Sequence, residues 1–438
     1  MRWLVLGLLL LAPAPAAAHG REPFVGRIAV NPGSGALVAR ATWGLVLTDD
    51  GDDWRWVCAA AMGTLPTRED PPLVLASDGA IVVGNIAGIW RSQGGRCGFE
   101  RAYDAASVID LDARPSAPDE LYALVSDGVD HLERSEDGGR TWARIATRPE
   151  GTVMERLRLA PSDPEVVYLS GVRLADASTP RAVGVHRSGD GGRSFTAWEI
   201  PLLEGERNAR LLAIDPTDAD RLLVHLTRRA VDGRPERVLL SEDGGRSFAL
   251  VLEGLAVADA AFSADGARAW VALRASEGLH RSDDGGRTFT LAHEGDFPCV
   301  TASGDTLWVC VDETRDGYAV GRSTDGGDTV TPVLRFDDVR RLPDCPTCSE
   351  VAYVCPAWYP DLAFDLGHEG AEAPDGGVTG APRDVSPPAA CVDAGPAPPS
   401  PSEGCGCRAA GGASTPWLAL LLLSAAGLRS RRARRRRA

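Results

Sequence analysis

The stretch Ser135-Glu136-Asp137-Gly138-Gly139-Arg140-Thr141-Trp142 is repeated along this chain. Its pattern is a hydroxyl residue, an aspartate two positions later, paired glycines, an arginine, a second hydroxyl and an aromatic ring. Three more copies keep this pattern, and a fifth ends in valine. Two earlier copies match it only in part, since the copy at Thr48 is one residue shorter and the copy at Ser92 lacks the aspartate. The seven copies begin at positions 48, 92, 135, 188, 241, 282 and 323. A repeat spacing of 41 to 53 residues is typical of propeller blades.

The residue types of the repeat are those of a tight turn. The hydroxyl and the carboxylate can accept hydrogen bonds from N–H groups of their own loop, and the glycines allow positive φ. The closing Trp or Phe is expected to place its ring in the layer between neighbouring sheets. This structural role is assigned to Asp50, Ser135, Asp137, Trp142, Ser188, Asp190, Phe195, Ser241, Asp243, Phe248, Ser282, Asp284, Phe289, Ser323 and Asp325.

The repeat resembles the Asp-box, or bacterial neuraminidase repeat, which is found in sialidases, sortilin-type receptors, xyloglucanases and photosystem-assembly propellers. We call the seven copies box turns. The resemblance implies that each one joins the third and fourth strands of a blade, on the face away from any active site. Its aspartates would then be structural. An alternative is that Asp49, Asp50, Asp52 and Asp53 bind calcium through alternating acidic oxygens.

Short apolar segments bounded by Pro, Asp and Gly turns lie between the copies, and this pattern predicts an all-β fold. We expect a seven-bladed β-propeller over residues 19–366, with a cysteine-rich closing segment at 339–366. Two arrangements of that segment stay open. Residues 339–344 and 350–358 can form two strands of an eighth blade, or the segment can be a cysteine-stapled flap that closes the ring.

The two ends of the chain predict export and surface attachment. Residues 1–18 have the charged start, the apolar run and the small-residue cleavage site of a signal peptide. Residues 367–404 are rich in Pro, Gly and Ala and are predicted to be a disordered linker.

Residues 405–438 contain Cys405 and Cys407, a short apolar helix at 416–428 and an arginine tail. They resemble the myxobacterial-type C-terminal sorting signal, which implies membrane contact before removal of the tail and then display at the cell surface. A simple tail anchor is the alternative.

The chain has ten cysteines, and export makes disulfides the expected state. Cys299 and Cys310 flank a turn at Gly304-Asp305, which predicts a bridge between adjacent strands. Cys58 and Cys97, near the ends of the first two blades, are candidates to staple those blades together.

Four more cysteines, Cys345, Cys348, Cys355 and Cys391, are enough for two further bridges, but their spacing leaves the pairing open. A zinc site on Cys345 and Cys348 is the alternative. No second Cys-x-x-Cys and no nearby histidine support it.

Charge and motifs exclude several functions. A formal charge of −15 argues against nucleic acid as a partner, because phosphates require a basic surface. The seven histidines are scattered singly, and the paired glycines lead into another strand instead of the helix that a phosphate loop requires. We therefore predict no cofactor and no metal.

The sialidase resemblance raises the question of an active site. It implies three arginines that converge on a carboxylate, a tyrosine nucleophile with a glutamate, and an aspartate. The first arginine would come from an Arg-Ile-Pro motif, and Gly26-Arg27-Ile28-Ala29 matches it without the proline. Arg27 is thus the one catalytic candidate, although an ordinary strand role is favoured. Tyr122 and Tyr168 occupy positions typical of a core.

The sequence favours a monomeric, non-catalytic binding or scaffold module, displayed at the cell surface, that contacts a protein or glycan ligand at the open face of the ring. That step rests on analogy with other propellers. A sialidase-like exo-glycosidase is the first alternative. An assembly factor for another envelope protein is the second.

Overall fold

The structure is a computed structural model of the chain. It describes residues 22–31, 33–64, 70–148, 151–229, 233–372 and 385–392. The predicted signal peptide, the sorting motif with Cys405 and Cys407, and the apolar helix with its arginine tail lie outside the described residues.

Seven four-stranded antiparallel sheets account for the strands of the described residues, and each sheet uses four consecutive strands. Blades 1 to 4 consist of β1 (Val25–Val30), β2 (Leu37–Ala41), β3 (Gly44–Thr48), β4 (Arg55–Cys58); β5 (Leu73–Leu75), β6 (Ile81–Asn85), β7 (Gly88–Gln93), β8 (Gly98–Tyr103); β9 (Val108–Arg114), β10 (Ala117–Ser126), β11 (Asp130–Ser135), β12 (Ala143–Thr147); and β13 (Thr152–Leu159), β14 (Val167–Arg173), β15 (Ala182–Ser188), β16 (Thr196–Glu199). Blades 5 to 7 consist of β17 (Glu206–Ile214), β18 (Leu222–Arg228), β19 (Glu236–Ser241), β20 (Ala249–Gly254); β21 (Val257–Phe262), β22 (Ala269–Leu273), β23 (Gly278–Ser282), β24 (Thr290–His293); and β25 (Cys299–Ser303), β26 (Thr306–Cys310), β27 (Val320–Ser323), β28 (Thr331–Leu334).

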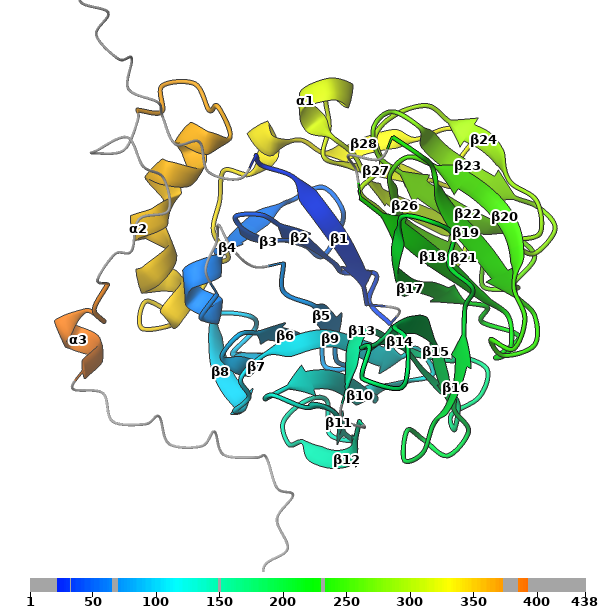
Figure 1. Cartoon of the computed structure of the whole chain (residues 1–438). Coiled ribbons are helices and arrows are strands. Elements are labelled where there is room, and N and C mark those ends of the chain that lie inside the picture. Colours follow the sequence, from blue (N-terminus) through cyan, green and yellow to red (C-terminus); the bar gives the residue numbers. More distant parts are fainter. Residues whose placement is uncertain are drawn as a thin grey trace, which may run out of the picture. The chain divides into compact units, whose positions relative to one another are not determined.

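The blades form a closed ring (Figure 1). The first strand of each blade contacts the first strand of the next, and β25 of blade 7 contacts β1 of blade 1. The predicted all-β, seven-bladed propeller is confirmed. Two short helices lie between strands, η1 (Ala59–Met62) and α1 (Glu313–Asp316), and a third, η3 (Phe336–Asp338), follows the last strand.

Every box turn joins the third and fourth strands of its blade. In blade 4, Ser188 Oγ accepts from the Gly192 N–H and donates to Asp190 Oδ1, at 2.8 and 2.7 Å. The other Asp190 oxygen accepts from the Ser194 hydroxyl at 2.6 Å. Hydrogen bonds from the Ser194 hydroxyl and N–H lower the pKa of Asp190 to about 2.

Apolar side chains fill the layers between blades. Between blades 3 and 4, Tyr122 and Leu132 meet Leu157 and Leu169, and Phe195 of a box turn packs against them. Tyr122 and Tyr168 are fully buried, so their predicted core positions are confirmed. Since these layers repeat around the ring, each blade has a buried face toward each neighbour.

The closing segment contains a helix where the eighth-blade alternative placed a strand. Glu350–Asp365 form α2, with Val351, Val354, Cys355 and Leu362 on its buried side. Those positions follow the 3.6-residue period of a helix, so the eighth-blade interpretation is wrong. Pro356 and Pro360 are both exposed, which places their missing N–H groups on the solvent side.

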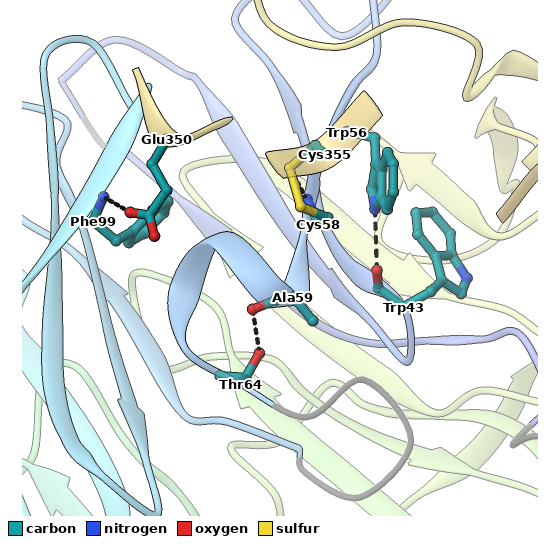
Figure 2. The surroundings of a disulfide bond; sticks show 8 residues. All are labelled: Trp43, Trp56, Cys58, Ala59, Thr64, Phe99, Glu350 and Cys355. Carbon is teal, nitrogen blue, oxygen red and sulfur yellow. Dashed lines mark hydrogen bonds between the residues drawn. A yellow bond between two sulfur atoms is a disulfide. The ribbon is translucent and has the colours of Figure 1, made fainter. Parts of the chain in front are cut away.

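Disulfides attach the closing segment to the start of the ring. Cys355 is bonded to Cys58 of blade 1, and Cys345 is bonded to Cys97 of blade 2. The suggested Cys58–Cys97 bridge is therefore wrong, because each of these cysteines faces the closing segment instead. Figure 2 shows the first bond beside Trp56, whose Nε1 donates to the Trp43 carbonyl at 3.1 Å.

The other two disulfides are local to the second half of the chain. Cys299 is bonded to Cys310 across the β25–β26 hairpin, the pair that the turn spacing predicts. Cys348 forms a disulfide with Cys391, a residue of the short helix α3 (Ala389–Val392). Both cysteines of the Cys-x-x-Cys pair are thus oxidised, which contradicts the zinc alternative. Cys391 also ties part of the predicted linker to the closing segment.

Among the residues that the structure describes, no helix combines the length and the apolar character needed to cross a bilayer.

Candidate functional site

A charged cluster occupies the centre of the ring, where the first strands face one another. Asp110 of β9 is fully buried and accepts from Arg158 of β13 at 2.9 Å. Arg156 of β13 and Arg27 of β1 approach the same carboxylate at 3.8 Å. Arg27, the catalytic candidate, thus lies with two other arginines around one acidic side chain.

The acidic side chains of β9 also bind the edge of the next blade. Asp110 accepts from the Leu157 N–H at 3.0 Å, and Asp112 accepts from the Leu159 N–H at 2.8 Å. Asp259 does the same for Val300 at 3.3 Å. The first strand of a blade has one unpaired edge, so these carboxylates supply acceptors that no neighbouring strand provides.

Burial and charge shift the pKa values of this cluster. Burial would raise the pKa of Asp110, but Arg158, Arg156 and Arg27 together lower it. Burial dominates for Asp112 and raises its pKa. Burial, opposed by Asp110, lowers the pKa of Arg156 to about 10. Asp110 is therefore a buried anion whose single negative charge offsets part of the positive charge of the three arginines around it.

This geometry differs from what the sialidase resemblance implies. Three arginines converge, but the carboxylate that they hold belongs to the protein itself. Among the described residues, the first strands of the seven blades contain no tyrosine.

A tyrosine–glutamate pair exists elsewhere: Tyr103 of β8 donates to Glu133 of β11 at 2.6 Å. These are a fourth and a third strand, and burial raises the pKa of Tyr103, which makes its oxygen a weaker nucleophile at neutral pH.

The box aspartates point at their own loops. Asp50 accepts from the N–H groups of Asp52 and Asp53 at 2.9 Å, and Asp53 binds Arg55 and Arg341. Asp49 pairs with Arg96 at 3.0 Å. Among the described residues, no group of three or more Asp, Glu, His or Cys side chains is arranged to hold a metal ion.

Two cavities lie in the central channel, the space between the first strands of the blades, at the end that carries the box turns. One of about 440 Å³ is lined by Pro115, Pro161 and Pro216 of the turns between first and second strands. Another, of about 240 Å³, reaches Asp112, Arg158 and Asp259. In the sequence, these prolines indicate turns and nothing more. The charged residues could be found, because Asp110-Leu-Asp112 and Arg156-Leu-Arg158 alternate charged and apolar residues, which places the charges on one face of each strand.

The opposite end of the ring carries exposed aliphatic side chains. In an up-and-down blade, the turns after the second and fourth strands share one end, away from the box turns. Six large apolar residues at this end have exposed fractions of 36 to 57%: Ile86, Val129, Val153, Leu174, Leu203 and Leu255. We call these six the aliphatic rim.

The comparisons with known proteins support the fold. No family model and no curated protein matches the chain. Among solved structures, an ancestral GH74 enzyme aligns with a TM-score of 0.55 and 14% identity, over 71% of this chain and 46% of that one. The GH74 enzyme of Niastella koreensis aligns with a TM-score of 0.41 and 16% identity, over 70% of this chain and 65% of that one. YCF48 from Cyanidioschyzon merolae aligns with a TM-score of 0.40 and 16% identity, over 61% of this chain and 86% of that one.

The chain spans less than two thirds of the length of either of these GH74 enzymes. At 14% identity, the likeness to the ancestral GH74 enzyme concerns the fold alone.

Proposed function

We propose that the protein is a non-catalytic binding module displayed at the cell surface, and that its aliphatic rim contacts a protein ligand. One observation supports this proposal: six of the nine exposed large apolar side chains of the described residues lie at the end of the ring away from the box turns. Apolar surface exposed at one end of a protein is a feature of contact sites between proteins. A glycan would be recognised mainly through aromatic faces and polar groups, and the rim residues are aliphatic.

Surface display is supported by the disulfides and the predicted ends of the chain. Four disulfides favour an oxidising compartment. The signal peptide and the sorting signal resemblance supply the route and the attachment.

A matched pair of variants tests the rim. Leu203→Glu with Leu255→Glu places two charges on the rim, where the leucines are 53 and 54% exposed. Leu250→Glu with Leu291→Glu is the control, because these leucines are 52 and 50% exposed but lie on fourth strands. A partner recovered by crosslinking envelope extracts is purified, and its affinity is measured for each variant.

We expect the rim variant to weaken binding by about tenfold or more, and the control to bind as the parent does. Equal affinity for all variants would overturn the rim as the binding surface. Binding in a glycan array without any protein partner would instead favour the glycan alternative.

The exo-glycosidase alternative has less support, because Asp110 occupies the position where the arginines would hold a substrate carboxylate. Release of sialic acid by the purified protein would support the exo-glycosidase alternative. The assembly-factor alternative is a special case of protein binding, and the identity of the crosslinked partner decides it.

A further inference from the structure

A small pocket lies between blade 1 and α2, beside the Cys58–Cys355 disulfide. Three indole rings line it: Trp43 from the β2–β3 turn, Trp56 from β4 and Trp358 from α2. Figure 2 shows Trp43 and Trp56 next to the disulfide. The cavity volume is about 40 Å³.

One face of α2 supplies the opposite wall. Trp358, Asp361, Leu362 and Asp365 all line the pocket, and their spacing of three, four and seven residues places them on one side of the helix. Asp361 is buried at 4% exposure, whereas Asp365 is exposed at the helix end. Both carboxylates already have interaction partners. The pocket therefore combines aromatic rings with two carboxylate side chains.

We propose that this pocket binds a methylated ammonium group. A cation is attracted to the faces of tryptophan rings, and nearby carboxylates add to that attraction. The methyl groups suit a wall of Leu362 and the alanines of η1, where an unmethylated ammonium would lose hydrogen bonds to water.

The charge requirement is tested with two ligands of one shape. Calorimetry on the intact protein compares choline with 3,3-dimethyl-1-butanol, in which carbon replaces the charged nitrogen. We expect choline to bind at least about tenfold more tightly, the scale of a desolvated cation–π contact. Equal affinities, or no binding of choline, would overturn the proposal.

Variants locate the binding. Trp358→Leu keeps an apolar wall but removes one ring, and we expect it to abolish the preference for choline. Asp365→Asn, at an exposed position, should weaken choline binding and leave the neutral ligand unchanged. Tyr353→Leu is the control, because Tyr353 is a partly buried aromatic residue of α2 outside the pocket. An unchanged choline preference in Trp358→Leu would contradict the assignment.

Two further ligands identify the natural source of the group. Phosphocholine represents a head group, and a peptide with trimethyllysine represents a modified protein. The tighter ligand of the two gives the source. These tests are independent of the aliphatic rim, so failure of either proposal leaves the other standing.

Discussion

A box aspartate holds its turn through both carboxylate oxygens. One carboxylate oxygen of Asp190 accepts hydrogen bonds from the Ser188 hydroxyl and the Ser194 N–H. The other oxygen accepts one from the Ser194 hydroxyl. The same contacts recur at Asp137, Asp243, Asp284 and Asp325. One residue type at one position thus fixes the same hairpin in blade after blade.

Asp190→Ala is expected to lower the free energy of unfolding by about 1–2 kcal/mol, because three loop donors lose their acceptor. Urea unfolding followed by circular dichroism measures this. Asp305→Ala, at an exposed turn outside the box turns, is the control and should change stability by less than about 0.5 kcal/mol. Equal effects would contradict a structural role for the carboxylate.

The lowered pKa values predict acid sensitivity. The pKa is lowered to about 2 for Asp50, Asp137, Asp190 and Asp325, from an ordinary value of 3.8. A depressed folded-state pKa contributes stability that is complete above the unfolded value and is lost as pH falls. We expect stability to decline between about pH 4 and pH 2, and Asp190→Asn to reduce that slope. A slope that Asp190→Asn leaves unchanged would contradict this cause.

Asp110→Ala should be more damaging than any box variant. It leaves Arg158, Arg156 and Arg27 together in the channel without their shared anion, and it removes the acceptor of the Leu157 N–H. Loss of one partner from a buried ion pair costs about 3–5 kcal/mol. Thermal unfolding monitors the change, with Arg101→Ala at an exposed ion pair as the control.

At the scale of elements, α2 shows what the sequence could and could not predict. The spacing of Val351, Val354, Cys355 and Leu362 indicates a helix, but the two prolines in the segment disfavour one. The blades were predictable because each one repeats a local turn. The Cys58–Cys355 bond was not, because 297 residues separate its ends and only closure of the ring brings them together.

The central cluster could be predicted only in part, because the alternation of charged and apolar residues does not show which strands meet. Arg27 was selected by a motif, whereas Asp110, Arg156 and Arg158 come from other blades. Which of their side chains reach the channel depends on strand register, and β13 changes register between Met154 and Arg156. Such irregularities leave no mark in the residue pattern.

The prolines of α2 give a prediction for this element. Pro356→Ala should raise the free energy of unfolding by about 1 kcal/mol or more, because it restores an N–H and relieves a helix-breaking residue at an exposed position. Pro216→Ala in a turn should not stabilise the protein. Denaturant unfolding compares the two, and destabilisation by Pro356→Ala would show that the proline is required for the helix to pack.

At the scale of the whole molecule, the described strands close the ring without one that is shared between the first and last blades. The seam between blades 7 and 1 has side-chain contacts, such as Trp54 Nε1 to the Val333 carbonyl at 2.9 Å. The closing segment then runs along blade 1, where the backbone N–H of Trp56 donates to the backbone carbonyl of Arg341 at 2.8 Å. Two disulfides fix it to blades 1 and 2.

Hydrogen exchange at this seam tests ring closure most directly. The variant Cys58→Ser, Cys355→Ser is compared with Cys299→Ser, Cys310→Ser, whose bond spans only 11 residues within one hairpin. In the chain-entropy model, a disulfide that closes a loop of more than 100 residues stabilises the folded protein by more than about 4.7 kcal/mol. A disulfide that closes a short loop contributes about 3 kcal/mol. We predict faster exchange in β4 and β28 only when the Cys58–Cys355 bond is lost. Unchanged protection of both strands in that variant would contradict closure by this segment.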